Sequence, residues 1–461
     1  MSLRNLPGIA CSLRRNRRPG VVELASLQQE RLVRLIGFAR DNSPFYRKLY
    51  ERLPVGVADL RMLPPVSKGD LMENFDEWVA DPAVKRKDSE TFVSDPARIG
   101  SLFLERFVAF ATSGTSGRPA VFLHDGDAAR VYASLAVMRR LPSLIAPRTL
   151  RSLLLRGGRT ATVVTTGGHF TSSVIEGLFR KRYPHLARRN RIFSILMPLP
   201  ELTRALNDYR PAILGGYPTA LTLLAQEQAA GRLRIDPGVV LTGAERLSPI
   251  SREQISAAFR CPVRDTYAAS EFMGIAFDCR QSRLHVNADW LILEPVDAAY
   301  RPVPPGQPSA TCLLTNLANR IQPILRYELG DSVTWVPIPC PCGSTLPVIE
   351  VVGRRDEIIC FRGPGGETIQ VLPMAIATLV EEIPGVRSYQ AIQKSPSSLI
   401  LRIEEVPGFD RRIVVDAVAG RLRGYWAGQG FPWIAVEATE EMPRREPAGG
   451  KLRQIYSEFI P

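Results

Sequence analysis

The sequence Ala111-Thr112-Ser113-Gly114-Thr115-Ser116-Gly117-Arg118-Pro119 alternates hydroxyl-bearing residues with glycines. It lies between two short apolar segments, Phe107-Val108-Ala109-Phe110 and Ala120-Val121-Phe122-Leu123, which are typical of strands. Glycine lets backbone N–H groups come close to an anion, the hydroxyls add further donors, and the arginine adds positive charge. The stretch therefore predicts a hairpin whose loop holds phosphate.

This loop is not a Walker phosphate loop, which needs the pattern G-x-x-x-x-G-K-[ST] at the start of a helix. Here the chain leaves the loop through an apolar segment that is typical of a strand. By itself the stretch fits a flexible Ser/Gly turn of a hairpin equally well. Motifs elsewhere in the chain have to decide between the two interpretations.

Further motifs occur in a fixed order along the chain. They are Ser43-Pro44-Phe45-Tyr46-Arg47, Leu214-Gly215-Gly216-Tyr217-Pro218, Thr242-Gly243-Ala244-Glu245, Asp265-Thr266-Tyr267-Ala268-Ala269-Ser270-Glu271, Ile324-Leu325-Arg326-Tyr327-Glu328-Leu329-Gly330-Asp331, Gly353-Arg354-Arg355-Asp356-Glu357 and Gly449-Gly450-Lys451. Each motif is weak alone, but the ordered set is specific. Over nearly its whole length the chain resembles the adenylate-forming superfamily, in the branch typified by phenylacetate-coenzyme A ligase and capsule-biosynthesis-type proteins.

The composition is that of a globular protein with more than one domain. The chain has 461 residues, of which 45% are hydrophobic and 23% charged, and no apolar run approaches the roughly 20 residues of a membrane span. The first 20 residues carry five arginines but no apolar core followed by a cleavage site, so we expect no secretory signal. We expect a cytoplasmic protein.

The net charge of +13 favours anionic partners such as nucleotides, coenzyme A, an acidic carrier protein, nucleic acid or a membrane surface. The densest basic cluster lies in residues 180–191, where a solvated face is the simpler interpretation than a docking patch. No nucleic-acid motif accompanies the cluster, so we expect no nucleic-acid partner.

Alternating patterns predict the fold class. Strand-like and helix-like segments alternate from about residue 212 to residue 267, which predicts an α/β sheet with crossover helices and ligand groups in the loops that leave its strands. The pattern breaks between Gly353 and Gly366, and beyond it two helices are interleaved with strands. We therefore expect a large N-terminal domain with mixed sheets, residues 1–355, and a small, mobile α+β C-terminal domain, residues 356–461.

Four residues predict a metal site. Cys279 and His285 precede a Cys340-x-Cys342 pair, and three thiolates with one imidazole can complete a tetrahedral zinc shell. A coincidence in a Pro/Gly-rich loop is the alternative, but the phenylacetate-ligase branch carries similar Cys/His positions. A closed shell of four protein ligands leaves no position for water, so this Zn²⁺ would be structural.

The resemblance implies an ATP site with bound Mg²⁺. It assigns the β- and γ-phosphates of ATP to the loop, with Arg118 in place of the common lysine, and Mg²⁺ to Glu271. Tyr267 would stack near adenine, Asp331 would accept from both ribose hydroxyls, and Arg354 would support the same sugar. The expected nucleotide contacts are Thr112, Ser113, Gly114, Thr115, Ser116, Gly117, Arg118, Gly243, Ala244, Glu245, Tyr267, Asp331 and Arg354. On simpler interpretations Glu271 caps a turn, and Asp331 belongs to a turn with an ion pair.

The resemblance also assigns roles in the C-terminal domain and in the acid pocket. Lys451 matches the mobile lysine that bridges the carboxylate and the α-phosphate during adenylation, and Asp356 lies at the expected hinge. In this branch the acid is usually aromatic. The expected acid pocket comprises Gly216, Tyr217, Ala268, Ala269 and His169, although an ordinary surface histidine is an equally good interpretation of the last.

The leading hypothesis is an AMP-forming acid–thiol ligase that makes an acyl-AMP from ATP, releases pyrophosphate and passes the acyl group to coenzyme A. A second hypothesis delivers the group to the phosphopantetheine of an acyl carrier protein or to an amine. A third is a non-catalytic nucleotide-binding scaffold. The expected partners are a small carboxylic acid and coenzyme A or a carrier protein, with a homodimer left open.

Overall fold

The computed structural model describes residues 21–54, 56–57, 59–112, 120–166, 168–352, 359–363, 365–366, 368–371, 373–444 and 454–459. Several residues of the expected site lie outside these ranges. They are Ser113, Gly114, Thr115, Ser116, Gly117, Arg118, Arg354, Asp356 and Lys451. Their expected roles stay predictions.

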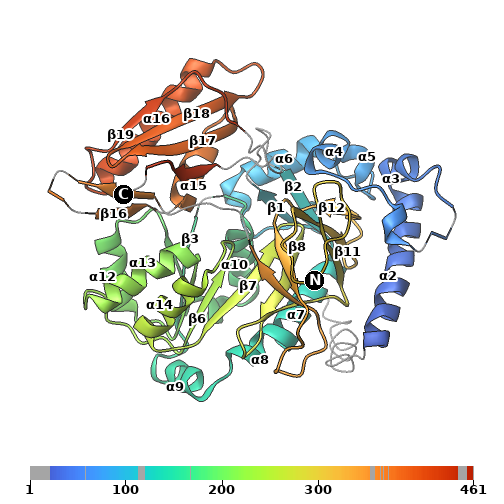
Figure 1. Cartoon of the computed structure of the whole chain (residues 1–461), viewed down its shortest axis with the longest axis horizontal. Helices are drawn as coiled ribbons and strands as arrows, with labels where there is room; N and C mark the ends of the chain where they lie inside the picture. The colour runs from blue at the N-terminus through green and yellow to red at the C-terminus, as the bar shows by residue number, and fades with distance from the viewer. Residues whose placement is uncertain are drawn as a thin grey trace.

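Short helices lead into the fold. The first described helices are α2 (Val21–Asn42) and α3 (Pro44–Leu49), and Ser43 caps α3 by accepting from the backbone N–H of Tyr46. The following helices are η2 (Leu60–Met62), α4 (Lys68–Glu73), α5 (Phe75–Trp78), α6 (Arg86–Ser94) and η3 (Pro96–Arg98). In Figure 1 this blue part of the chain borders the two small sheets that hold β1, β2, β11 and β12.

A nine-stranded mixed sheet forms the centre of the molecule. Its order is β13 (Val333–Val336), β14 (Val348–Val351), β9 (Leu284–Val286), β8 (Phe272–Asp278), β7 (Val263–Ala269), β6 (Val239–Gly243), β5 (Ile213–Gly216), β3 (Thr160–Val164) and β4 (Asn190–Ser194). The five strands from β7 to β4 are parallel, and the other pairs are antiparallel. The expected α/β fold with a mixed sheet is therefore confirmed.

Crossover helices connect the parallel strands, as the alternation predicts. They are α10 (Thr171–Arg182), α11 (Pro184–Ala187), α12 (Leu199–Tyr209), α13 (Pro218–Ala229) and α14 (Pro249–Phe259), whereas α9 (Pro147–Leu155) leads into β3, the first of these strands in the chain. Ser248 caps α14, and Pro249 occupies its first turn. Gly216 has no room for a side chain, because a Cβ there would lie 2.7 Å from the carbonyl oxygen of Val163 on the neighbouring strand.

Two smaller sheets lie beside the central one. The expected hairpin pairs β1 (Val108–Thr112) with β2 (Ala120–His124), and both strands are largely buried. A three-stranded sheet has the order β10 (Leu291–Val296), β11 (Thr311–Asn316) and β12 (Tyr327–Glu328). Between β2 and β3 the chain forms α7 (Gly126–Leu135), a π-helical turn (Ala136–Arg140) and α8 (Leu141–Leu144).

The last hundred residues form a lobe of their own, seen in orange and red at the top of Figure 1. Its elements are β15 (Ile359–Arg362), β16 (Thr368–Val371), α15 (Pro373–Glu381), β17 (Val386–Ser395), β18 (Ser398–Glu405), α16 (Arg411–Gly428), β19 (Ala435–Ala438) and β20 (Ile455–Ser457). The sheet order is β19-β18-β17-β20, and one hydrophobic cluster lies between it and the helices. The expected boundary at residue 356 falls outside the described residues and stays a prediction.

The C-terminal lobe contacts the central sheet near β3 and β4. The hydroxyls of Thr165 and Thr378 are 3.1 Å apart, and Gln429 Nε2 donates to the carbonyl oxygen of Leu196 at 2.8 Å. Among the described helices, we find none that combines the length and the apolar character needed to cross a membrane.

Candidate active site

A lysine that was not among the expected residues reaches the phosphate hairpin. Backbone pairing of Val66 with the residues on either side of Tyr327 fixes the segment that enters α4, with distances of 3.1 Å to the Arg326 carbonyl oxygen and 2.9 Å from the Glu328 nitrogen. Lys68 is the first residue of α4, and its Nζ donates to Thr112 Oγ1 at 2.9 Å. The end of β1 therefore has a cation beside it, where the expected phosphate loop begins.

Glu271 lies in the tight connection between β7 and β8, where Ala269 pairs with Phe272. Its side chain is buried at 8% exposure. Burial raises the pKa of Glu271, while a hydrogen bond with Tyr327 and the positive charge of Lys68 act in the opposite direction. A further cation near this carboxyl would favour its charged form.

Tyr267 and Asp331 are 64 residues apart in sequence and in direct contact in the fold. The hydroxyl of Tyr267 donates to Asp331 Oδ2 at 3.0 Å. Burial, together with the neighbouring Cys312 and Asp331, raises the pKa of Tyr267 well above its usual value, so the hydroxyl keeps its proton and remains a donor.

These contacts bring the described part of the expected ATP site together. Thr112 contacts Lys68, the charge of Lys68 acts on Glu271, and Asp331 raises the pKa of the same Glu271 carboxyl. The end of the phosphate hairpin, the expected metal carboxylate and the expected ribose carboxylate therefore share one region, at the ends of β1, β7 and the β12–β13 connection.

The expected adenine segment follows β6. Glu245 Oε2 accepts from the backbone N–H and the hydroxyl of Thr219, at 3.1 and 2.7 Å, so this carboxylate caps the first turn of α13. Ala244 has a left-handed backbone conformation with φ of +67°, which turns the chain sharply after Gly243. The expected adenine contact of this segment stays a prediction.

The expected acid-binding residues lie at the same end of the parallel sheet. Gly216 ends β5, and Ala268 and Ala269 end β7. The hydroxyl of Tyr217 accepts from the backbone N–H of Thr165 at 3.3 Å. His169 is buried, with its ring 5.5 Å from that of Phe92, and its carbonyl oxygen accepts from the Ala111 N–H at 2.9 Å. The surface-histidine interpretation is wrong, and the role of His169 in binding the acid stays a prediction.

Lys68 could have been found from one local signal. A lysine in the first turn of a helix opposes the helix dipole, and this helix has a complete capping box formed by Ser67 and Asp70. A cation at that place suggests a function other than helix stability. Its partner Thr112 lies 44 residues away, so only the fold reveals what it contacts.

The four expected metal ligands converge. The ligand atoms of Cys279, His285, Cys340 and Cys342 all lie within 4.8 Å of one another. Cys279 Sγ is 3.7 Å from Cys340 Sγ, and Cys342 Sγ is 3.3 Å from His285 Nε2. Tetrahedral zinc with Zn–S bonds of about 2.3 Å places two thiolates about 3.8 Å apart, so the spacing fits this ion.

The imidazole is oriented for metal binding by a second contact. His285 Nδ1 lies 3.0 Å from the carbonyl oxygen of Leu346, which can only accept, so Nδ1 carries the proton and Nε2 presents its lone pair to the thiols. Cys279 follows the end of β8, whereas Glu271 precedes its start. Eight residues of strand span about 26 Å, so the cluster lies far from the carboxylate and cannot act on the same reacting atoms.

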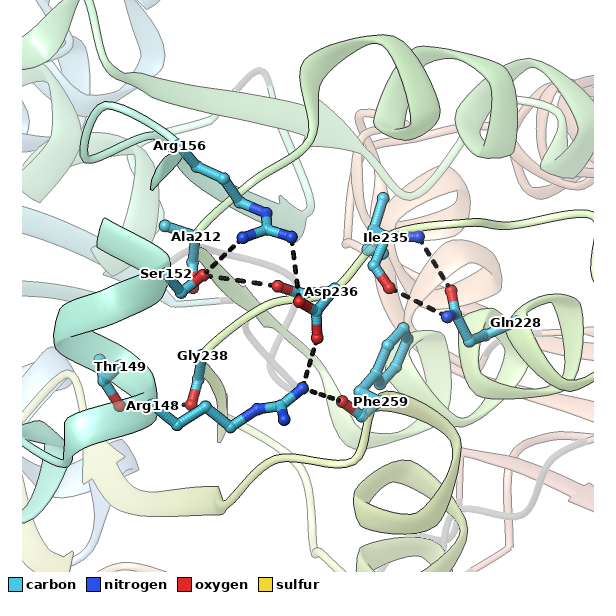
Figure 2. Close-up of polar contacts among 10 residues, drawn as sticks. All are labelled: Arg148, Thr149, Ser152, Arg156, Ala212, Gln228, Ile235, Asp236, Gly238 and Phe259. Carbon is cyan, nitrogen blue, oxygen red and sulfur yellow. Dashed lines mark hydrogen bonds and ion pairs between the residues drawn. The ribbon is translucent and has the colours of Figure 1, made fainter. Parts of the chain in front are cut away.

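A cavity of about 740 Å³ lies between α13 and α14 and is not this site. Asp236 and Phe259 line it, and they precede β6 and β7, whereas Gly243 ends β6 and Glu271 follows β7. Figure 2 shows Asp236 held between Arg148 and Arg156, with the Arg156 contact at 3.0 Å. At this opposite end of the sheet, the ion pairs of Asp236 attach the α9 region to the segment before β6.

The basic cluster is also remote from the ATP site. Its cations at positions 180, 181, 182, 188, 189 and 191 are exposed, at the C-terminal end of α10 and beyond. The N-terminal end of α10 touches the site, since the hydroxyls of Thr171 and Ser270 are 3.3 Å apart. The 12 residues of α10 span about 18 Å, so the cluster does not serve the nucleotide phosphates.

Comparison with known proteins agrees with the resemblance. No family model matches the sequence. A phenylacetate-coenzyme A ligase of Thermus thermophilus is 25% identical over 424 residues, covering 87% of this chain and 85% of that protein. Protein CapK of Staphylococcus aureus is 21% identical over 374 residues, covering 78% and 74%.

Solved structures share the fold. A structure of 2-hydroxyisobutyryl-CoA ligase, in complex with 2-HIB-AMP and CoA in the thioesterification state, superposes with a TM-score of 0.62 at 21% identity. The match covers 96% of this chain and 92% of that one. The ordered motifs, the convergence of the described site residues and these relatives agree with one another, and the chain is similar to members of the adenylate-forming superfamily in the branch of phenylacetate-coenzyme A ligase and CapK.

Proposed function

We propose that this chain activates a small carboxylic acid with ATP and transfers the acyl group to the thiol of coenzyme A. In the first step a carboxylate oxygen attacks the α-phosphorus of ATP, and the bond from that phosphorus to the pyrophosphate oxygen breaks. In the second step the sulfur attacks the acyl carbon, the thiol proton is lost, and AMP leaves. The observation that carries the proposal is the convergence of Lys68, Thr112, Glu271, Tyr267 and Asp331.

The charges of these residues suit the first step. A leaving pyrophosphate gathers negative charge, and Lys68 beside Thr112 supplies a cation at the start of the phosphate loop. Asp331, already oriented by Tyr267, offers a carboxylate to the two ribose hydroxyls. Positioning and electrostatic stabilisation are the main contributions that a phosphoryl-type site can make.

Glu271 fits a magnesium ion. Mg²⁺ is usually held by one or two carboxylates together with substrate phosphates, and it would neutralise charge on the phosphate oxygens here. Glu271 supplies the carboxylate, and Tyr327 orients it by a hydrogen bond. A divalent cation would offset the cost of burying the charged form of this carboxyl.

Lys451 is proposed to complete the adenylation site, with Asp356 as the hinge. The residues that flank the segment around Lys451 are both fixed to β17. The backbone carbonyl oxygen of Arg444 accepts from Gln390 Nε2 at 3.0 Å, and the Gln454 carbonyl oxygen accepts from the Ala391 N–H at 2.7 Å. Both flanking residues therefore belong to the C-terminal lobe, which supports a role for Lys451 that depends on the position of that lobe.

We also propose a structural Zn²⁺ bound by Cys279, His285, Cys340 and Cys342. It would join the end of β8 to the loop before β14, and all four positions of a tetrahedral ion would be filled by protein. A donor set of three soft thiolates and one imidazole selects zinc over magnesium or calcium.

The acid and the acceptor are tested by product analysis. The purified chain would be incubated with ATP, Mg²⁺ and, in turn, phenylacetate and 2-hydroxyisobutyrate, which the names of the relatives suggest, and benzoate as a further aromatic acid. We expect an aromatic acid to yield its acyl-CoA thioester, identified by mass spectrometry. If a thioester forms on a carrier protein, or an amide forms with an amine, and no acyl-CoA is found, coenzyme A is not the acceptor. The proposal would then name the carrier protein or the amine instead.

A further inference from the structure

The turn that carries Glu271 is held by side chains from two distant parts of the chain. His124, at the end of β2, places its Nε2 2.8 Å from the carbonyl oxygen of Ser270. Asn316, at the end of β11, donates from Nδ2 to the carbonyl oxygen of Glu271 at 2.8 Å. Both carbonyls of the two-residue turn are therefore fixed by buried side chains.

One tyrosine connects the two side chains. The hydroxyl of Tyr132 on α7 lies 3.1 Å from His124 Nδ1, and it accepts from Asn316 Nδ2 at 2.9 Å. The exposed fractions of His124, Tyr132 and Asn316 are 1%, 3% and 0%. The three residues thus form a buried polar network around the turn.

The chemistry of the partners fixes every proton in this network. A carbonyl oxygen only accepts, so His124 Nε2 carries the hydrogen and donates to Ser270. Nδ1 is then an acceptor, and the Tyr132 hydroxyl donates to it while accepting from Asn316. Burial lowers the pKa of His124 to about 4, so the ring remains neutral near pH 7 and this pattern persists.

The same region also fixes the free edge of β2. Leu123 donates from its backbone N–H to Gln322 Oε1 at 2.6 Å, and its carbonyl oxygen accepts from Asn319 Nδ2 at 2.8 Å. Asn316 Oδ1 accepts from the N–H of Ala318 at 2.9 Å, which orders the loop that supplies these amides. The strand that leaves the phosphate loop and the turn that carries the carboxylate are therefore parts of one hydrogen-bonded unit.

We propose that His124 is a positioning residue for Glu271, acting with Tyr132 and Asn316 to keep the metal-binding carboxylate at a fixed distance from the phosphate hairpin. The inference rests on the proposed role of Glu271 in binding Mg²⁺. Groups that orient a metal ligand through a hydrogen bond contribute strongly to affinity, and their replacement commonly weakens metal binding by about 10- to 100-fold. Here the orientation acts through the backbone of the turn and not through the carboxylate itself.

The test uses substitutions at two positions of the network. His124→Phe keeps a planar ring and removes both nitrogen contacts, whereas His124→Gln retains an amide that can donate to Ser270. Tyr132→Phe removes only the connecting hydroxyl. Tyr209→Phe is the matched control, because the Tyr209 hydroxyl also donates to a backbone carbonyl, that of Arg189 at 2.8 Å, at the far edge of the sheet.

Three measurements are made on the full chain. The affinity for Mn²⁺ with a non-hydrolysable ATP analogue is measured by electron paramagnetic resonance, amide hydrogen exchange is followed in the peptide around residues 268–273, and acid-dependent pyrophosphate exchange is assayed against Mg²⁺ concentration. For His124→Phe we expect Mn²⁺ affinity to fall about 10-fold or more, faster amide exchange in that peptide, and a raised Mg²⁺ requirement. His124→Gln should recover most of the affinity, and Tyr209→Phe should match the parent.

The outcomes separate this inference from the proposed function. Unchanged Mn²⁺ affinity in His124→Phe, or a loss that Tyr209→Phe shares, would overturn the positioning role. If His124→Phe does not fold, Tyr132→Phe decides by the same affinity measurement. A parent chain that binds Mn²⁺ with the analogue but exchanges no pyrophosphate would defeat the proposed function only, and weaker Mn²⁺ binding by the variants would then still support the inference.

Discussion

Replacement of Glu271 by glutamine should separate the activity of this site from its stability. The substitution keeps the size of the side chain and removes its charge. Because the carboxyl is 8% exposed and burial raises its pKa, the ionised form that Mg²⁺ needs is disfavoured by the fold itself. We therefore expect Glu271→Gln to lose activity without losing stability.

The size of the activity loss follows from the role of the group. Removing one preorganised electrostatic group from a water-poor site costs about 2.7–4 kcal/mol of transition-state stabilisation, so pyrophosphate exchange should fall about 10²- to 10³-fold.

The sign of the stability change follows from linkage. The folded-state pKa of Glu271 is raised, so ionisation opposes folding increasingly as the pH rises from the unfolded value of 4.5 through the folded-state pKa. Without metal, the variant should be at least as stable as the parent at pH 8, and its advantage should shrink toward pH 5.

The assay combines acid-dependent exchange with thermal unfolding in EDTA at pH 5 and pH 8. Glu227→Gln is the matched control, because Glu227 is also 8% exposed but lies on α13, where both of its oxygens bind Arg232 at 2.7 Å. The control should lose some stability at pH 8 and keep full activity. Exchange at the parent rate by Glu271→Gln, or a clear loss of its stability at pH 8 without metal, would refute the reasoning.

Three further substitutions test the other parts of the site. Lys68→Met should raise the ATP concentration needed for half-maximal exchange and lower the rate about 100-fold, because a cation is lost beside Thr112; an unaltered ATP dependence would remove Lys68 from the site. Lys451→Ala should abolish exchange while the melting temperature and binding of an ATP analogue are retained, and unchanged exchange would contradict its role. Cys340→Ser should lower both bound zinc, by elemental analysis, and the melting temperature; a parent chain with no zinc would disprove the metal site.

Local patterns predicted the hairpin and the convergence of the four Cys/His side chains well. The apolar segments on either side of residues 111–119 became β1 and β2, because strand residues that are buried on both faces appear as continuous apolar runs. The cysteines and His285 converge as expected, because few residue types bind zinc and their spacing carries the signal. The Glu271 and Asp331 positions came from the resemblance, since a lone acidic residue after a strand has no distinctive pattern.

Contacts between distant segments could not be predicted in the same way. Lys68 reaches Thr112 only because Val66 pairs beside Tyr327 on β12, more than 250 residues away in sequence. His124 appears in the sequence as the last residue of an apolar strand, and its partners come from α7 and the β7–β8 turn. The pairing in the C-terminal sheet was likewise not predicted, because β20, near the C-terminus, pairs parallel to β17, which precedes α16. Register and side-chain partners of this kind depend on the tertiary fold.

The central claim is that these residues form a site for acid adenylation. Its most direct test is isotope exchange between pyrophosphate and ATP, catalysed by the purified chain with Mg²⁺ and each acid of the panel. The account predicts exchange that requires an added carboxylic acid and proceeds without coenzyme A, since the acyl-AMP forms before the thiol enters. Binding of ATP with no exchange for any acid, across a broad panel, would contradict it.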